Sequence, residues 1–321
     1  MPGISHIRDA VLLSGAVLLG GVIASVLPPV GFGLVAAGMA ALVFRGRATV
    51  AAVAGGATVA LGTFAVPLDA ILLAPVLAAI MLLIGVMQRR SALFGVAVLT
   101  AVMTAGSLAS DAARAWLQGA SFVERMRETT AAAVAAFVEA AGGVGADGTL
   151  YGVDPEMLAD MMFRLWPLDY FATALVSALV SVAVIGWVAG RSGAAINRLP
   201  RLDVLDLSPH VLWPFIGAFA FLAAGRAMAD GELATTVGLN LLLGVRLLLL
   251  AQGLAVVSAF YRRIGLGKWA RGAGYVLLAL ADSVIPLVSM VGLIDFWANL
   301  RKLPRADSSE TRGVEDGDGG G

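Results

Sequence analysis

Long apolar runs that contain no charged residue are the feature of this sequence that most constrains its fold. A transmembrane helix needs about 20 apolar residues to cross the hydrocarbon core of a bilayer. Runs that reach or approach this length occupy residues 10–44, 48–68, 70–88, 91–110 and 170–190. They lack the strict alternation of apolar and polar residues that marks the strands of a transmembrane barrel. The pattern therefore predicts an all-α fold, a polytopic transmembrane helical bundle.

Nine apolar segments can be delimited, and the number that cross the membrane is predicted to be eight or nine. Hydrophobic residues make up 59% of the chain and charged residues only 14%, which excludes an ordinary soluble domain. The second segment is short for a crossing and follows Pro28-Pro29, and nine crossings would leave the basic pair Arg301 and Lys302 outside. The segments are about 10–27, 30–44, 48–68, 70–88, 91–115, 168–190, 209–229, 233–261 and 272–297.

The distribution of charge between the segments predicts their orientation. Cytoplasmic connections carry an excess of Lys and Arg. Alternate connections here contain Arg45 and Arg47, Arg89 and Arg90, Arg191, Arg198 and Arg201, and then Arg262, Arg263, Lys268 and Arg271. The opposite connections carry acidic residues, including those between Asp111 and Asp160. We therefore expect a multi-pass membrane protein with its N-terminus inside.

The expected domain organisation is one integral membrane domain, residues 1–302, with an external helical insertion at about 116–167. The insertion is predicted to hold a helix over 121–141 and a short helix with Asp154 as N-cap and Pro155 at its first position. The second helix has an apolar face rich in Met, which fits an interfacial helix, a helix packed on the bundle, or a cover over a substrate entrance. The Gly-rich, acidic tail, residues 303–321, is predicted to be disordered.

Polar residues inside the predicted spans mark the candidate site. Arg246 lies in the middle of one span and Asp282 near the middle of the next, so antiparallel neighbours would bring the two charges together near the bilayer midplane. Asn240 and Gln252 share the span of Arg246. The pair is interpreted either as a functional polar site or as a structural ion pair, and the sequence does not decide between them.

Few residues are available for catalysis or for binding a metal or a cofactor. The chain has no cysteine and only His6 and His210, so neither a metal centre nor a catalytic residue is expected. The segment Gly265-Leu-Gly267-Lys268 lacks the spacing of a phosphate-binding loop, and Trp269 stands where such a loop has Ser or Thr. No enzyme activity, cofactor or nucleic-acid partner is predicted, and any energy for transport must come from a partner or an ion gradient.

Three stretches carry a resemblance to a known family. They are Leu27-Pro-Pro-Val-Gly31 with Ala40-Ala-Leu-Val-Phe-Arg45-Gly46, then Asn240 with Gln252-Gly-Leu-Ala-Val-Val-Ser-Ala-Phe260, and the ending from Ile285-Pro286 to Arg301-Lys302. Together they resemble the DUF2232 or YybS-like family of bacterial membrane proteins over most of the chain. This resemblance implies a multi-pass protein of the bacterial cytoplasmic (inner) membrane. Asn299 and Leu300 stand where the family pattern commonly has Asp and Phe. The resemblance implies a distant similarity to the substrate-binding S components of energy-coupling-factor transporters and to the rod-shape protein MreD, without assigning binding residues.

Two functions of different classes follow. The first is a small-solute transporter or a substrate-binding subunit that depends on separate ATPase and transmembrane coupling subunits. The second is a membrane scaffold of the cell envelope or division machinery that transports nothing. A polar and aromatic cavity near Arg246 and Asp282 would favour the first, and a fully packed interior the second.

Overall fold

The structure, a computed structural model, describes residues 2–24, 26–65, 67–145, 148–150, 152–228 and 230–303. All regular secondary structure in these ranges is helical, apart from an isolated bridge between Leu150 and Val153. The chain divides into two compact units, Met1–Leu199 and Pro200–Gly321, which we call the N-terminal unit and the C-terminal unit. From residue 304 onward, the tail that was predicted to be disordered lies outside the described residues.

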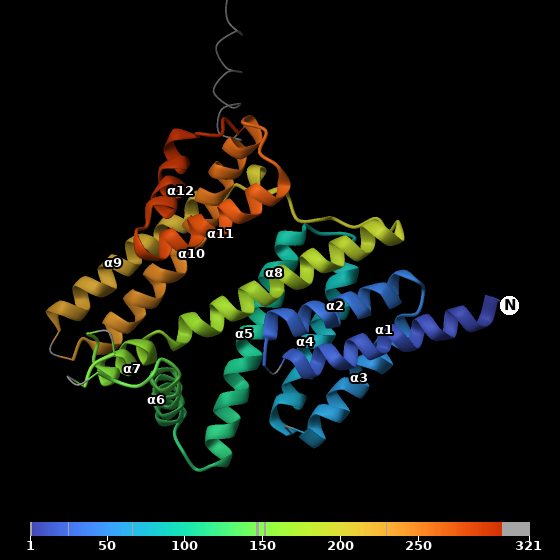
Figure 1. The fold of residues 1–321 in the computed structure, drawn as a ribbon, viewed down its shortest axis with the longest axis horizontal. Coiled ribbons are helices and arrows are strands. Elements are labelled where there is room, and N and C mark those ends of the chain that lie inside the picture. Colours follow the sequence, from blue (N-terminus) through green and yellow to red (C-terminus); the bar gives the residue numbers. More distant parts are fainter. Residues whose placement is uncertain are drawn as a thin grey trace, which may run out of the picture. The chain divides into compact units, whose positions relative to one another are not determined.

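The N-terminal unit is a helical bundle (Figure 1). Its helices are α1 (Pro2–Ala24), α2 (Pro28–Phe44), α3 (Ala48–Ala65), α4 (Pro67–Val86), α5 (Ala92–Leu117), α6 (Phe122–Ala140), α7 (Pro155–Arg164) and α8 (Trp166–Ser192). Helix starts follow local chemistry: Pro28 occupies a first-turn position of α2, and the Ser91 hydroxyl accepts the Phe94 N–H at the start of α5. The α8 helix ends at Gly193, whose φ of +69° suits glycine.

Apolar residues from α1, α2, α3, α4, α5 and α8 form the core of the N-terminal unit. Among its fully buried members are Met39, Ile80, Ile84, Leu99 and Ile185. Helices α1 and α2 approach so closely that a Cβ atom on Gly31 would lie 2.1 Å from the Ala24 nitrogen. Small residues permit this kind of close backbone approach between membrane helices. Their tight packing fixes the positions of Ala24 and Pro28 at one end of the bundle.

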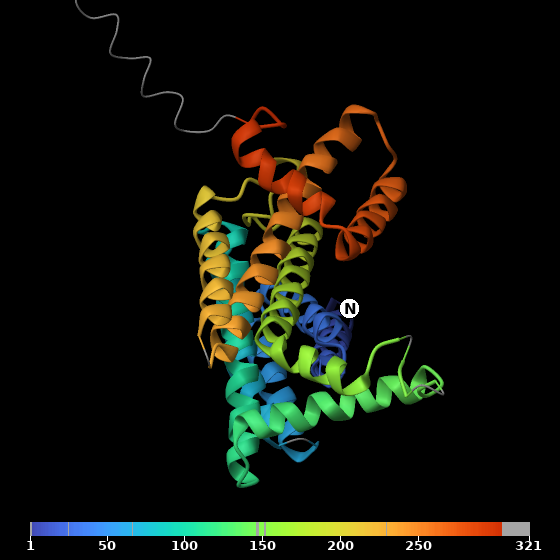
Figure 2. The same ribbon diagram turned by 90° about the vertical axis from the view of Figure 1, so that its left-hand side faces the viewer.

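Helices α6 and α7 lie within the predicted insertion at about 116–167, and its position outside the membrane stays a prediction. Figure 2 shows α6 running across the long axes of α5 and α8. Ser121 and Glu124 make a capping box at the start of α6, and the Asp154 carboxylate accepts the Glu156 N–H at the start of α7. The hydrogen bonds from Ser121 lower the pKa of Glu124 below its ordinary value. The Arg127 guanidinium lies 4.5 Å from the Phe163 ring centre and joins the two helices.

The described residues of the C-terminal unit form two short 3₁₀ turns and four α-helices. The 3₁₀ turns are Leu202–Val204 and Pro209–Val211; the helices are α9 (Leu212–Ala227), α10 (Glu232–Arg263), α11 (Lys268–Val284) and α12 (Leu287–Ala298). Helices α9 and α10 lie side by side (Figures 1 and 2). Helices α11 and α12 correspond to the ninth predicted segment, which is broken at Ile285-Pro286 and bent by 98°.

On helix α11, Tyr275 and Asp282 face the protein, whereas several large apolar residues face outward. Asp282 is buried and Tyr275 is half-buried, whereas Leu277, Leu280 and Val284 are exposed. This arrangement is the reverse of the one found on the surface of a soluble protein, where the apolar stripe faces the core. An outward apolar face fits contact with lipid chains.

The helical and membrane character of the chain is confirmed, whereas the number of crossings stays a prediction. Among the described residues, four helices are long and apolar enough to cross a bilayer: α5, α8, α9 with the preceding 3₁₀ turn, and α10. The bent pair of α11 and α12 raises this number to five if it forms one span. Shorter apolar helices cover Asp9–Ala24, Pro28–Phe44, Ala48–Ala60 and Pro75–Val86, within the first four predicted segments.

The crossing of α10 and α12 supplies a first prediction. A Cβ atom on Gly292 would lie 2.1 Å from the Leu249 carbonyl oxygen, and backbone atoms cannot move aside as a flexible side chain can. We expect Gly292→Ala to lower the free energy of unfolding in detergent by about 1–3 kcal/mol through overpacking. Gly272→Ala is the matched control, because no atom lies within 4 Å of a Cβ atom there. Equal stability of the two variants would contradict the predicted close crossing.

Candidate functional site

Arg246 and Asp282 lie together between α10 and α11. The Arg246 Nε lies 3.6 Å from Asp282 Oδ2, and the same guanidinium donates a hydrogen bond to the Asp282 backbone carbonyl. The Asp282 side chain is 2% exposed and that of Arg246 is 30% exposed. The structure therefore brings these two predicted site residues together, with the carboxylate buried and the guanidinium partly accessible.

Asp282 also caps helix α12 across the helix break. Its Oδ1 accepts the Ser289 N–H at 2.9 Å, and its Oδ2 accepts the Ser289 hydroxyl at 2.6 Å. The first-turn N–H groups of a helix lack partners within the helix. The Asp282 carboxylate, on the other side of the break at Pro286, accepts one of these N–H groups. These contacts account for both oxygens of the carboxylate without a ligand.

Gln252 belongs to a second polar cluster in the C-terminal unit, together with Asp206, Asp295 and Arg301. The Gln252 Nε2 donates to Asp206 Oδ1 at 3.0 Å and to Asp295 Oδ2 at 2.9 Å, while its Oε1 accepts the Leu207 N–H at 3.1 Å. Gln252 and Asp295 are fully buried. The cluster joins α10 and α12 to the segment that precedes α9.

Arg301 supplies the positive charge of this cluster. Its Nη2 lies 2.8 Å from Asp295 Oδ2 and 3.3 Å from Asp206 Oδ1, and its Nη1 donates to the backbone carbonyls of Asp203 and Leu205. The sequence placed Arg301 only in a basic end after the last segment. The structure instead buries its side chain, which is 2% exposed.

The four candidate residues therefore do not form one site. The Asn240 side chain donates to the Thr236 carbonyl within α10 at 2.8 Å. Asn240 and Gln252 are 12 residues apart on α10, which corresponds to about 18 Å along the helix axis. Arg246 pairs with Asp282, whereas Gln252 joins the separate cluster around Arg301.

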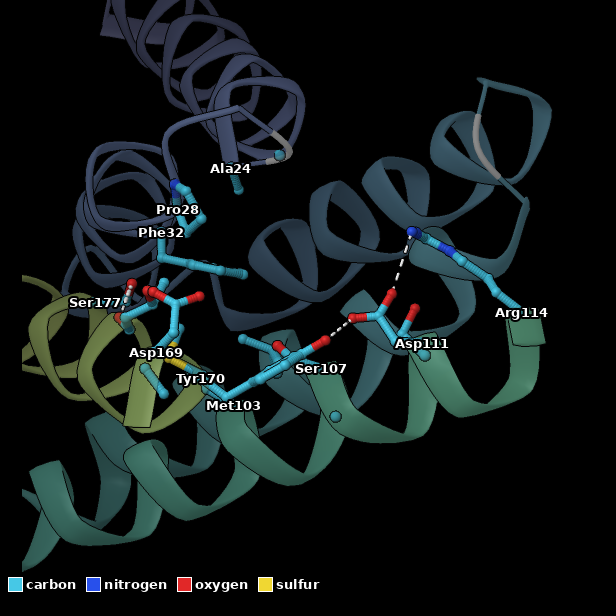
Figure 3. Close-up of a pocket in the computed structure, with 16 residues that line it drawn as sticks. Ala24, Pro28, Phe32, Met103, Ser107, Asp111, Arg114, Asp169, Tyr170 and Ser177 are labelled. Carbon is cyan, nitrogen blue, oxygen red and sulfur yellow. Dashed lines mark hydrogen bonds and ion pairs between the residues drawn. The ribbon is translucent and has the colours of Figure 1, made fainter. Parts of the chain in front are cut away.

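The N-terminal unit contains a cavity of about 400 Å³ that was not predicted from the sequence (Figure 3). Its polar lining comes from the last turns of α5 and the first turns of α8. These polar residues are Ser107, Ser110, Asp111 and Arg114 on α5, and Asp169, Tyr170, Thr173 and Ser177 on α8. Apolar lining residues include Ala24, Pro28, Phe32, Val76 and Met103. The cavity thus combines charged groups, hydroxyls and two aromatic rings.

Asp111 links the two polar walls of the cavity. Its Oδ1 lies 3.5 Å from Arg114 Nη1, and its Oδ2 accepts a hydrogen bond from the Tyr170 hydroxyl. Figure 3 draws both interactions: the contact with Arg114 lies within α5, and the contact with Tyr170 joins α8 to α5. All three side chains are partly buried, so these contacts fix their orientation at the cavity wall.

Aromatic contacts connect the cavity to helix α6. The Trp166 ring stacks edge-on against Phe122 and Tyr170, with ring centres 5.2 Å and 5.9 Å apart. The Tyr170 hydroxyl also lies 3.5 Å from the sulfur of Met126, a buried residue of α6. Helix α6 therefore helps to hold Tyr170 in place at the cavity.

A spacing signal in the sequence could have revealed this cavity. Ser107, Ser110, Asp111 and Arg114 recur at helical spacing on one face of an otherwise apolar segment. Tyr170, Thr173 and Ser177 do the same on α8. The acidic stretch that begins at Asp111 obscures this signal, because a charge near the end of an apolar segment is also typical of the start of an external loop.

Three buried hydroxyls lie deeper on the same two helices. Within the described part of the chain, Thr100, Thr104 and Ser181 have no hydrogen-bond partner for their side-chain oxygens. Thr104 and Ser181 are one helical turn from the lining residues Ser107 and Ser177. Buried hydroxyls of this kind commonly bind water.

Comparison with known proteins identifies the family. The family model described as "Predicted membrane protein (DUF2232)" matches residues 15–296, which is most of the chain. The chain belongs to this family. No curated protein and no solved structure matches it.

The residues that suggested DUF2232 membership lie at structurally central positions. Pro28 lines the cavity, and Gly31 lies at the close approach of α1 and α2. In the closing segment, Asp295 and Arg301 bind one another within the buried cluster. Asn299 has a φ of 40°, a left-handed conformation that asparagine tolerates, and its side chain hydrogen-bonds to Leu303.

Proposed function

We propose that this DUF2232 protein binds a small solute in the cavity of its N-terminal unit and acts as a solute-binding subunit or permease. The cavity between α5 and α8 is the observation that carries the proposal. Its volume, about 400 Å³, falls within the usual range of ligand pockets, roughly 300–1,000 Å³. Its lining also has the usual composition, an apolar wall with a few convergent polar groups.

The orientation predicted from charge places this cavity toward the outer face of the inner membrane. Helix α5 begins directly after Arg89 and Arg90, and its opposite end carries Asp111 and Arg114. Helix α8 begins at the cavity and ends beside Arg191. We propose that α1 to α4 also cross the membrane. Together with the four long helices this gives eight crossings, or nine if the bent pair of α11 and α12 forms one span.

Transport would depend on other subunits or on an ion gradient. The chain has no phosphate-binding loop, since Gly265-Leu-Gly267-Lys268 lacks both the spacing and the hydroxyl residue. We therefore propose separate ATPase and transmembrane coupling subunits as partners, and no catalytic activity for this chain. Purification from native membranes under mild conditions, followed by identification of bound proteins, tests this part of the proposal.

A second candidate function, a non-transporting scaffold, is favoured by the C-terminal unit. Arg246 pairs with Asp282 and Asp295 pairs with Arg301, and neither Arg246 nor Asp282 lines the cavity. We therefore infer that the Arg246–Asp282 pair has a structural role. A scaffold would retain this unit and would bind no solute in the N-terminal unit, so solute binding separates the two functions.

Filling the cavity tests the proposed function directly. Ser107 lines the cavity and is exposed, so Ser107→Phe should place a ring in the cavity without disturbing the core. We expect small molecules that co-purify with the wild-type chain to be lost from this variant. Mass spectrometry of extracts from the purified proteins measures the loss.

Ala105→Phe is the matched control, because Ala105 is exposed on the same helix and does not line the cavity. It should retain the bound molecule at the wild-type level. Absence of any bound small molecule from the wild-type protein, isolated from its native membrane, would contradict solute binding.

A further inference from the structure

We infer that the cavity of the N-terminal unit selects a small organic cation, an amine with an apolar or aromatic body. The inference rests on the proposed solute-binding function and adds the chemical class of the solute. It follows from the charges, the hydroxyl groups and the aromatic rings that line the cavity between α5 and α8.

The charged lining residues are two carboxylates and one guanidinium, those of Asp111, Asp169 and Arg114, which leaves one net negative charge. The Asp111 carboxylate already pairs with Arg114 and accepts a hydrogen bond from the Tyr170 hydroxyl. Among the described residues, no side chain forms a hydrogen bond or ion pair with the exposed Asp169 carboxylate. Asp169 is therefore the charge at the cavity that a bound ammonium group can neutralise.

An anionic solute fits the same lining poorly. It would have to reach Arg114, whose guanidinium lies 3.5 Å from Asp111, and would come close to the Asp111 carboxylate in doing so. Like charges that face one another in a partly buried site are strongly unfavourable. Arg125 is close enough to influence Arg114, but it does not line the cavity and it donates to Gln118 outside it.

The neutral lining residues also suit an amine. The Ser177 hydroxyl donates to the Thr173 carbonyl at 2.7 Å, which leaves its oxygen as an acceptor for an ammonium N–H group. Phe32 and Tyr170 contribute aromatic rings, and a cation over such a ring gains a further electrostatic attraction. The rings also offer an apolar surface to the body of the solute.

Three probes of similar size and different charge test the inference: 2-phenylethylamine, 2-phenylethanol and 3-phenylpropionate. We expect the amine to bind the full-length chain in detergent and to raise its melting temperature, and the carboxylate to bind more weakly than the alcohol. Asp169→Asn should weaken amine binding about tenfold or more, as expected for loss of one charge-assisted contact. The same variant should leave the affinity for the alcohol unchanged.

Two further variants serve as controls. Asp169→Glu keeps the charge and should retain most of the affinity for the amine. Asp9→Asn removes a partly exposed carboxylate that pairs with Arg45 at 3.0 Å. Asp9 is 12 residues from Gly21, the nearest lining residue on α1, or about 18 Å along the helix axis. This variant should bind all three probes as the wild-type chain does.

The outcomes separate this inference from the proposed function. Preferential binding of 3-phenylpropionate, or co-purification of an anionic or neutral solute that Ser107→Phe loses, would overturn the inference and leave solute binding intact. Binding of none of the probes, together with no co-purified solute, would overturn both. An amine that co-purifies with the wild-type chain and is lost in Asp169→Asn would support both.

Discussion

Replacement of Arg301 by alanine is expected to lower the free energy of unfolding by about 3–5 kcal/mol, the usual cost of removing one partner from a buried ion pair. The variant would leave the fully buried Asp295 carboxylate without its guanidinium, which lies 2.8 Å away. It would also remove the donors to the carbonyls of Asp203 and Leu205. Unfolding in mixed detergent and SDS micelles, followed by circular dichroism, measures the change.

Arg301→Lys should recover only part of this loss. A lysine ammonium keeps the charge, but it lacks the planar fork that reaches Asp295 and two backbone carbonyls at once. Arg201→Ala is the matched control, because its side chain is 63% exposed and its partner Asp203 also binds Arg262. Exposed pairs contribute about 0–1 kcal/mol. Similar losses for Arg301→Ala and Arg201→Ala would show that the cluster is not buried as described.

The helices were predictable because the thickness of the bilayer fixes the length of an apolar segment. The segment at 233–261 corresponds to α10 (Glu232–Arg263), and the segment at 168–190 corresponds to α8 (Trp166–Ser192). The caps of α6 and α7 were also predictable, since Ser121 and Asp154 act on N–H groups within three residues. Local chemistry and membrane thickness both act over short stretches of sequence.

The break in the ninth segment was only partly predictable. Pro286 signalled a possible turn, because proline lacks the N–H group that a continuous helix requires. The bend of 98° depends in addition on Asp282 and Ser289, which bind across the break. Hydropathy alone describes 272–297 as one apolar segment and gives no indication of an internal cap.

The polar clusters could not be predicted because their members are far apart in the sequence. Gln252 and Asp206 are separated by 46 residues, and Tyr170 and Asp111 by 59. Composition places each residue near the end of a segment and does not show which ends meet. The pairing of Arg246 with Asp282 was accessible, since it follows from two neighbouring antiparallel helices with opposite charges at similar depth.

Replacement of Asp282 by alanine should also cost about 3–5 kcal/mol, the range for breaking a buried pair, because the residue serves two elements at once. The variant removes the acceptor for the Ser289 N–H and hydroxyl, and it removes the partner of Arg246. Hydrogen bonds to a charged group contribute about 1.5–3 kcal/mol each. Asp282→Asn should lose less, because its amide oxygen can still accept the Ser289 N–H group. Unfolding in mixed micelles compares the three proteins.

The charge-swapped variant Arg246→Asp with Asp282→Arg separates an ion pair from a helix cap. If the only role of Asp282 were to neutralise Arg246, the swap would restore most of the stability lost in the single variants. An arginine at 282 has no acceptor atom for the Ser289 N–H group at the start of α12. We therefore expect the swapped chain to remain about as unstable as Asp282→Ala, and recovery to the wild-type level would contradict the capping role. Because this test measures stability alone, its result does not depend on whether the cavity of the N-terminal unit binds a solute.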